Sequence, residues 1–243
     1  MNGTLALARA EILRLGRNKR YSIFSLGLPV VLYVIIAPSV KHYNPYGVPY
    51  AAYYMVAMAS FGAFSGALTG NAQRISQERK EGWVRQLRLT ALPANAYVVA
   101  KVIASMVTTV PAVVIVLALG RLVGGVHLAG WKWVAIGAAI WAGSMTFAAL
   151  AVAIGYRFDP DTVQPIALFI YLVMSVLGGI WFPLTGFLGK IGQVLPTYQI
   201  VKIGTDLIGS QSVPATAIIT ILAWFAAFVA LAVWAVRATA ETV

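Results

Sequence analysis

Six long stretches of this chain contain no Asp, Glu, Lys or Arg, and they constrain its fold more than any other feature. A helix needs about 20 apolar residues to cross the roughly 30 Å hydrocarbon core of a bilayer. A charged side chain at the centre of such a helix costs about 2.5–3.5 kcal/mol on insertion, so charge-free runs of this length predict spanning helices. The runs are Tyr21 to Val40, Tyr43 to Gln73, Val102 to Gly120, Trp133 to Tyr156, Thr162 to Gly189 and Leu207 to Val236.

The composition of the chain predicts the same class of protein. Of its 243 residues 60% are hydrophobic and 10% are charged, and the mean hydropathy is +0.82. A formal net charge of +11 could suggest nucleic-acid binding, but the chain has too few polar residues to cover the polar face of a soluble binder. Because there is no cysteine, disulfides, thiolate metal sites and thiol catalysis are excluded. We therefore predict an all-α integral membrane protein with membrane lipid, and no nucleic acid, as a partner.

The distribution of Lys and Arg predicts how the spans are oriented. With the N-terminus in the cytoplasm, 13 of the 18 basic residues fall on inner segments and 5 on outer ones, in agreement with the positive-inside rule. Both termini are therefore expected in the cytoplasm. No cleavable signal peptide is expected, since the basic region before Tyr21 is long and lacks a clean small-residue cleavage site. The predicted spans, within a single domain of residues 1–243, are approximately 21–40, 49–73, 102–122, 132–156, 162–182 and 213–236.

The residues before the first span predict a short amphipathic helix on the inner leaflet. Leu5, Ala8, Ile12 and Leu15 recur at spacings of three and four, whereas Arg14 lies away from this stripe. Such a helix lies in the membrane interface with its cations near anionic headgroups. A disordered basic N-terminus is the alternative.

Three glycines of the second span indicate close helix packing. Gly62, Gly66 and Gly70 are one helical turn apart, and small residues at this spacing allow helix backbones to approach closely in lipid. A contact within the chain is favoured over a contact between subunits. The alternative is ordinary membrane-helix composition, in which glycine is frequent.

The segment between the fifth and sixth spans is too apolar for an ordinary loop and too interrupted for one straight helix. We expect short external or re-entrant helices at the outer surface, closing the outer end of a pathway. The alternative is an extended fifth helix followed by a floppy loop. The candidate gate residues are Pro183, Gly186, Gly189 and Pro196.

The chain lacks the residue constellations of a membrane enzyme. Asp159 and Asp161 form a close acidic pair, which alone is a poor magnesium site and is better explained as the start of the fifth helix. The segment "GFLGKI" at 186–191 lacks the spacing and the Lys-Ser/Thr ending of a phosphate loop. The spans carry no ionisable residue near their centres, which argues against a proton or sodium relay. We therefore expect no catalysis and no cofactor in this chain, and a separate subunit that supplies the energy.

The segment "RISQERKEGWVRQLRLTALPANAYVVAKVIAS" resembles the connection between the second and third helices of permeases in the ABC transporter type-2 (ABC-2) exporter family, including multidrug-resistance exporters of the daunorubicin class. The sequence departs from the family pattern at Ala91, where proline is usual, and at Trp83, where threonine is commoner. The order of six spans and the "FPLTGFL" to "LPTYQ" region also fit this family. The matching positions are Glu78, Arg79, Glu81, Gly82, Leu87, Leu89, Thr90 and Lys101.

The resemblance implies that this segment is a cytoplasmic coupling helix that docks on an ATP-binding subunit. Gly82 can end the extension of the second span in a left-handed conformation, and the following turns present apolar surface and two arginines. The alternative is a basic loop that only sets orientation. The candidate coupling residues are Glu78, Arg79, Glu81, Gly82, Trp83, Arg85, Leu87, Arg88 and Thr90.

The resemblance further implies an exporter permease in the bacterial cytoplasmic (inner) membrane. Two ATP-binding subunits would hold ATP and magnesium, and a second permease subunit, the same or a related chain, would complete a dimer. An amphiphilic drug or lipid-like molecule is the expected cargo. A non-transport component, such as a scaffold or a six-helix lipid-modifying enzyme, is the alternative from another functional class.

Overall fold

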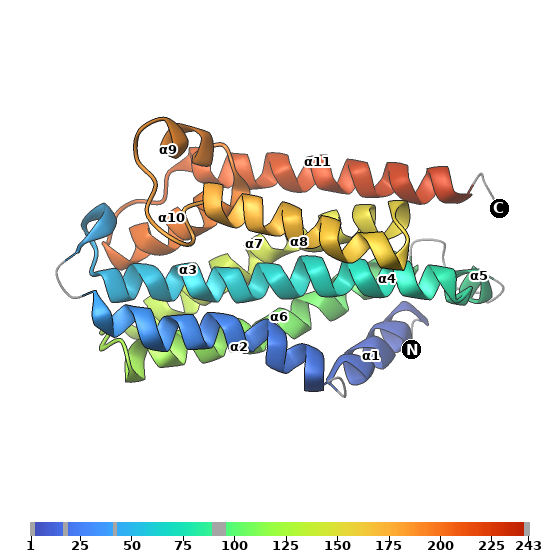
Figure 1. Cartoon of the computed structure of the whole chain (residues 1–243), viewed down its shortest axis with the longest axis horizontal. Coiled ribbons are helices and arrows are strands. Elements are labelled where there is room, and N and C mark those ends of the chain that lie inside the picture. Colours follow the sequence, from blue (N-terminus) through green and yellow to red (C-terminus); the bar gives the residue numbers. More distant parts are fainter. Residues whose placement is uncertain (1–2, 17–18, 41–42, 89–95, 241–243) are drawn as a thin grey trace.

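The computed structural model describes residues 3–16, 19–40, 43–88 and 96–240, and all regular elements in these ranges are helical (Figure 1). The long helices are α2 (Lys19–Ile36), α3 (Tyr50–Ser65), α6 (Ala96–Leu122), α7 (Gly130–Arg157), α8 (Pro160–Leu177) and α11 (Ala215–Ala240). The shorter elements are α1 (Gly3–Gly16), η1 (Ala37–Ser39), η2 (Pro45–Gly47), η3 (Gly66–Gly70), α4 (Asn71–Lys80), α5 (Trp83–Arg88), α9 (Gly186–Gly192) and α10 (Pro196–Ile208).

Five of the described helical segments are long and apolar enough to cross a bilayer, which agrees with an integral membrane protein. They correspond to the second through sixth predicted spans. The first predicted span, 21–40, corresponds to α2 and η1. In the part of it whose side chains the structure describes, the apolar helix Leu26–Ser39 is shorter than the other five, so the first span stays a prediction. The five segments are Tyr50–Lys80, Tyr97–Leu122, Gly130–Arg157, Pro160–Leu177 and Ala215–Ala238.

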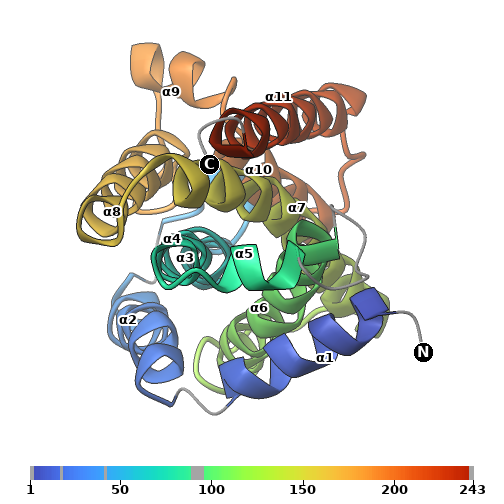
Figure 2. The ribbon, with the colours of Figure 1, turned by 90° about the vertical axis from the view of Figure 1, so that its right-hand side faces the viewer.

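A continuous helical rod of α3, η3 and α4 runs through the middle of the bundle. Its 31 residues have a length of about 46 Å at 1.5 Å per residue, well beyond the hydrocarbon thickness. The rod continues past residue 73, where the predicted span ends, because a helix whose backbone is satisfied internally can extend into water. Figure 2 shows α3 and α4 end-on, with α2, α6, α7 and α8 around them.

The turn η3 gives the rod one π-helical step at its centre. Two side chains bond to backbone carbonyls beside this step. Thr69 Oγ1 donates to Ser65 O at 2.8 Å, and Asn71 Nδ2 donates to Ala67 O at 2.9 Å. The predicted packing glycines Gly66 and Gly70 are the first and last residues of this turn, and both are buried.

Small residues let neighbouring helices approach the rod closely. A Cβ added to Gly62 would lie 3.2 Å from Pro29 Cγ of α2 and 3.2 Å from Ala112 Cβ of α6. A Cβ on Gly155 of α7 would lie 2.9 Å from a backbone oxygen of α4, Ala72 O, and 2.8 Å from Ile75 Cβ. Close approach of this kind is the main source of helix association in lipid.

The segment after α8 forms two short helices and not an extended fifth helix with a floppy loop: α9 is mostly exposed, and α10 is mostly buried. The fifth span ends at Leu177, five residues before its predicted end, because Gly179 turns the chain with φ +72°. Helix α10 then enters the bundle between α3 and α7, where a Cβ on Gly204 would lie 2.5 Å from Val56 Cγ1. Thr197 Oγ1 fixes the start of α10 by donating to Met174 O of α8 at 2.7 Å.

We predict that Gly155→Ala destabilises the protein by about 1–3 kcal/mol, the usual cost of overpacking. The added methyl group would meet backbone and a β-branched side chain that cannot rotate away. Gly27→Ala on α2 is the matched control, since nothing lies within 4 Å of its Cβ and alanine is the better helix former. The midpoint of thermal unfolding in detergent is the measurement. Equal midpoints for the two variants would show that α4 and α7 do not pack this closely.

Candidate coupling site

The rod ends in a sharp turn that leads into the short helix α5. The last turn of α4 closes with hydrogen bonds from Glu81 N to Gln77 O at 2.9 Å and from Gly82 N to Arg79 O at 3.1 Å. Gly82 takes φ +76°, a conformation that costs glycine little. Helix α5 begins at the next residue, and Figure 1 shows it at the same end of the bundle as α1 and the C-terminus.

A buried ion cluster joins α4 to α1 and α6 directly behind this turn. The ammonium of Lys101 lies 2.8 Å from Glu11 Oε2 and 2.7 Å from Glu78 Oε2. Tyr97 donates its hydroxyl to Glu78 Oε2 at 2.7 Å. All four side chains are nearly inaccessible, with Glu78 at 2% and Lys101 at 3% exposure.

This cluster fixes three helices relative to one another. A buried ion must be paired and hydrogen-bonded, because removing one partner leaves an uncompensated charge and costs about 3–5 kcal/mol. The short distances and the tyrosine hydroxyl meet that requirement here. A sliding or rotation of α1 or α6 against α4 would break these contacts, so the cluster holds one register.

A second set of polar contacts joins the rod to the junction between α7 and α8. Gln73 Nε2 donates to Pro160 O at 3.2 Å, and Ser76 Oγ donates to Phe158 O at 2.6 Å. Arg79 donates to Gly155 O at 3.0 Å and lies 5.2 Å above the ring of Tyr156. The end of the rod is therefore held from two sides, by α1 and α6 and by α7 and α8.

The predicted coupling residues divide into buried and exposed ones. Glu78 does not face outward; it pairs with Lys101 inside the bundle, so in this structure it cannot touch a partner directly. Glu81 and Trp83 are exposed, the indole to 39%. Val84 packs against the buried cluster that contains Ile75, Tyr97 and Tyr156. Arg85, Leu87 and Arg88 lie in α5, where the structure describes their backbone alone, and Thr90 lies outside the described residues.

Sequence reasoning missed Glu11 and the pairing of Lys101. The signal was present, because Glu11 is one helical turn from Ala8 and next to Ile12, on the apolar stripe of α1. A lone carboxylate on an apolar face needs a buried partner. The amphipathic pattern alone therefore placed α1 on lipid, whereas the structure packs Ala8 and Glu11 against the protein.

The candidate gate residues lie at the opposite end, around α9 and α10. Gly186 takes φ +63° in open space, and a Cβ on Gly189 would lie 3.0 Å from Leu184 O. Pro183 precedes α9 and Pro196 begins α10. A small cavity at this end, lined by Tyr46, Tyr53 and Tyr198 among others, holds about 10 Å³, which is room for about one water molecule.

The tyrosines of this end form a packed aromatic group. The rings of Tyr50 and Tyr54 stack at 5.4 Å between centroids, and Tyr46 meets Tyr198 edge-on at 6.5 Å. Burial, followed by the nearby Tyr198, raises the pKa of Tyr46 to about 12. Its hydroxyl therefore stays neutral at physiological pH. Within the described residues, no group of three or more His, Asp or Glu side chains could hold a metal ion.

Comparison with known proteins gives one family and one curated relative. The sequence profile of the family described as "ABC-2 family transporter protein" matches residues 34–237. The chain is 28% identical over 225 residues to a protein of Bacillus subtilis (strain 168) named "Putative transport permease YvfS". That alignment covers 91% of this chain and 92% of the relative. The matched family region contains Glu78 and Lys101, and Glu11 lies before it.

We predict that Lys101→Met lowers the free energy of unfolding by about 3–5 kcal/mol, since two buried carboxylates would face each other without their cation. Lys190→Met is the control, because Lys190 on α9 is exposed and should change stability little. Denaturant unfolding in detergent gives both values. Similar losses in the two variants would mean that the cluster contributes nothing to the fold.

Proposed function

The chain belongs to the ABC-2 family of transporter proteins, and from this premise we propose that it is the permease subunit of an ATP-driven exporter. Its role is that of a transport permease in a membrane. Family membership therefore favours transport over the scaffold and the lipid-modifying enzyme as the function. The proposal adds a direction, outward, and an amphiphilic or lipid-like cargo.

One observation carries the proposed mechanism: the rod's exposed tip is anchored from two sides. Trp83 and Glu81 are accessible at the tip, and Gln77 Nε2 bonds to Glu81 Oε1 at 2.9 Å. We propose that an ABC ATP-binding subunit docks on this tip. A tryptophan that becomes buried when a partner binds is a common hot spot in interfaces. An exposed carboxylate such as that of Glu81 adds charge specificity.

The anchoring contacts would turn docking into transport. When two ATP-binding subunits close on ATP, a push on α5 would reach α1 and α6 through Glu78 and Lys101. The same push would reach α7 and α8 through Ser76 and Arg79. Such rigid-body movement of packed helices is a known form of switching. Glu78 is then a positioning residue and Trp83 a contact residue.

The complete transporter would hold two permease subunits and two ATP-binding subunits. The permease pair, identical or related, would form the pathway between its members in the bacterial cytoplasmic membrane. ATP and magnesium would bind to the partner subunits. The packed aromatic group around Tyr46, Tyr53 and Tyr198, together with α9 and α10, would close the outer end in the resting state.

We predict that Trp83→Ala weakens binding of the ATP-binding subunit by roughly thirtyfold, the effect of removing a hot spot of about 2 kcal/mol. Trp131→Ala is the control, because Trp131 is exposed at the opposite end of the molecule. Binding is measured by titrating the purified ATP-binding subunit onto the permease in nanodiscs. Equal affinities for both variants would remove α5 as the docking element.

Glu78→Gln should act differently from Trp83→Ala. We expect near-normal binding of the ATP-binding subunit, because Glu78 is buried, but a several-fold lower ATP hydrolysis and transport by the reconstituted complex. The contrast between affinity and turnover separates positioning from contact. Normal turnover in Glu78→Gln, with unchanged stability, would contradict transmission through the ion cluster.

The proposed topology makes a separate prediction. Single cysteines at Gln77 on α4 and Gln211 before α11 are exposed in this naturally cysteine-free chain. A membrane-impermeant thiol reagent should label Gln77→Cys from the cytoplasmic side alone and Gln211→Cys from the outside alone. Labelling of both from one side would contradict cytoplasmic termini and the six-span arrangement.

A further inference from the structure

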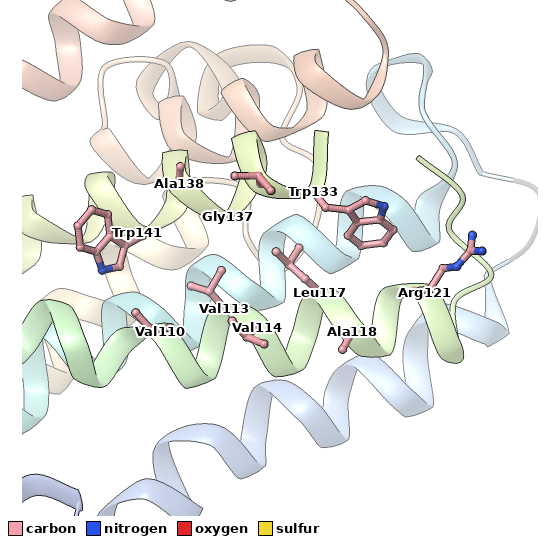
Figure 3. Close-up of a pocket in the computed structure, with 11 residues that line it drawn as sticks. Val110, Val113, Val114, Leu117, Ala118, Arg121, Trp133, Gly137, Ala138 and Trp141 are labelled. Atoms are coloured by element: carbon pink, nitrogen blue, oxygen red, sulfur yellow. The ribbon is translucent and has the colours of Figure 1, made fainter. Parts of the chain in front are cut away.

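A long apolar groove lies on the surface of the bundle between α6 and α7 (Figure 3). Its volume is about 580 Å³, within the range of sites that bind small molecules. Figure 3 shows Trp141 near one end and Arg121 at the other, with valines and a leucine of α6 between them. The groove is lined by Val110, Val113, Val114, Leu117, Ala118, Arg121, Trp133, Val134, Gly137, Ala138 and Trp141.

The walls of the groove offer apolar surface to an occupant. Trp141 donates its indole N–H to Met106 O at 2.8 Å, and Trp133 donates to Leu128 O at 3.3 Å. Both donors are therefore satisfied inside the chain, and the ring faces remain for packing. Gly137 and Ala138 have small side chains on the α7 side of the groove, which leaves room for an acyl chain lying along it.

Arg121 is the one charged residue of the groove. It stands in the last turn of α6, its side chain is exposed, and it forms no ion pair or hydrogen bond with any other described residue. Trp131 and Trp133 lie in the first turn of α7, and Trp133 lines the groove together with Arg121. Tryptophan is enriched at the headgroup level of membranes. A guanidinium at this depth matches a phosphate, which it can bind with two parallel hydrogen bonds.

The depth of the groove matches one leaflet. Val110 and Arg121 are 11 residues apart, or about 16 Å along the helix. Half of the roughly 30 Å hydrocarbon core is about 15 Å. An acyl chain whose headgroup sits at Arg121 would therefore reach Val110 and Trp141 near the middle of the bilayer.

A second groove repeats this construction toward the opposite membrane surface. Residues of α6, α7 and α11 line a groove of about 410 Å³ that includes Val98, Phe225 and Arg237. Here too a single arginine is the one charged lining residue. A third groove, of about 310 Å³ between α7, α10 and α11, contains Ile218 and Leu222 but no charged residue. Because it lacks an arginine, this third groove is a control for the two grooves that contain one.

We propose that the groove between α6 and α7 binds one glycerophospholipid of the surrounding membrane, with an acyl chain between the tryptophans and the phosphate on Arg121. In the proposed topology this lipid belongs to the outer leaflet. The site is separate from the coupling residues and does not depend on what is exported. A resident lipid here would hold α6 and α7 together at the end that lacks the ion cluster.

The test uses the full chain in nanodiscs and a phosphatidylglycerol with a photoactivatable diazirine at the end of one acyl chain. Peptide mapping should find the crosslink near Val110 and Trp141. Unlabelled phosphatidylglycerol should compete about tenfold better than diacylglycerol with the same chains, because diacylglycerol lacks the anionic phosphate that can form a charged, bidentate pair with Arg121. Arg121→Gln should abolish this difference, and Arg237→Gln should leave it intact.

Filling the groove provides the steric arm of the test. Ala138→Phe or Val114→Phe should lower the crosslink severalfold, whereas Leu222→Phe in the third groove should not. Unfolding midpoints identify any variant that fails to fold, and Val114→Phe replaces Ala138→Phe in that case. Equal labelling of wild type and both filled variants, or equal competition by the two lipids, would overturn the proposal. A change of oligomeric state in the filled variants would also overturn it, since the groove would then be a contact between copies.

Discussion

The ion pairs of Lys101 with Glu11 and Glu78 are the interaction on which the arrangement of helices behind α5 depends. Buried charges are tolerated only when geometry and hydrogen bonding compensate them, so their main effect is to specify one arrangement. Here they specify the positions of α1, α4 and α6 behind the α5 tip. The apolar packing of the bundle could accommodate small slides of these helices, but the ion cluster could not. We see this as the reason why the tip can act as a rigid point of contact.

The long rod and its small neighbours extend that rigidity through the membrane. The rod of α3, η3 and α4 is the most buried of the apolar helical segments, and Gly62, Gly155 and Gly204 bring α6, α7 and α10 against it. Because α10 packs against the far end of the same rod, the proposed docking tip and the proposed outer gate share one structural element. A movement of the tip would thus be transmitted along the rod to its other end, because no flexible linker lies between the two. The outward groove at Arg121 lies beside this path and is free to hold lipid.

The sequence predicted the helical spans well because long charge-free runs leave a chain few other folds. It also predicted a helical extension ending at Gly82 and short helices after the fifth span, but it placed the end of that span at residue 182 and not at Leu177. It did not predict that Glu78 points inward. The charge pattern around Glu78 does not show that α1 and α6, which are distant in sequence, cover this side of α4. Glu11 and Lys101 are 90 residues apart, and their pairing depends on how α1 folds back on α6. The groove at Arg121 was equally hidden, since it needs the packing distance between α6 and α7.

The central claim is that α1, α4 and α6 move as one body, because Lys101 of α6 pairs with Glu11 of α1 and Glu78 of α4, and that α5, which follows α4 directly, moves with them. Spin labels at Leu13→Cys on α1 and Gln86→Cys on α5, both exposed positions, allow this distance to be measured by double electron–electron resonance. In the complex with its ATP-binding subunits, the account predicts the same narrow distance distribution without nucleotide and with trapped ATP, and a broadened one when Lys101→Met is added. A shift of the distance on ATP binding, or a distribution that Lys101→Met leaves unchanged, would contradict it.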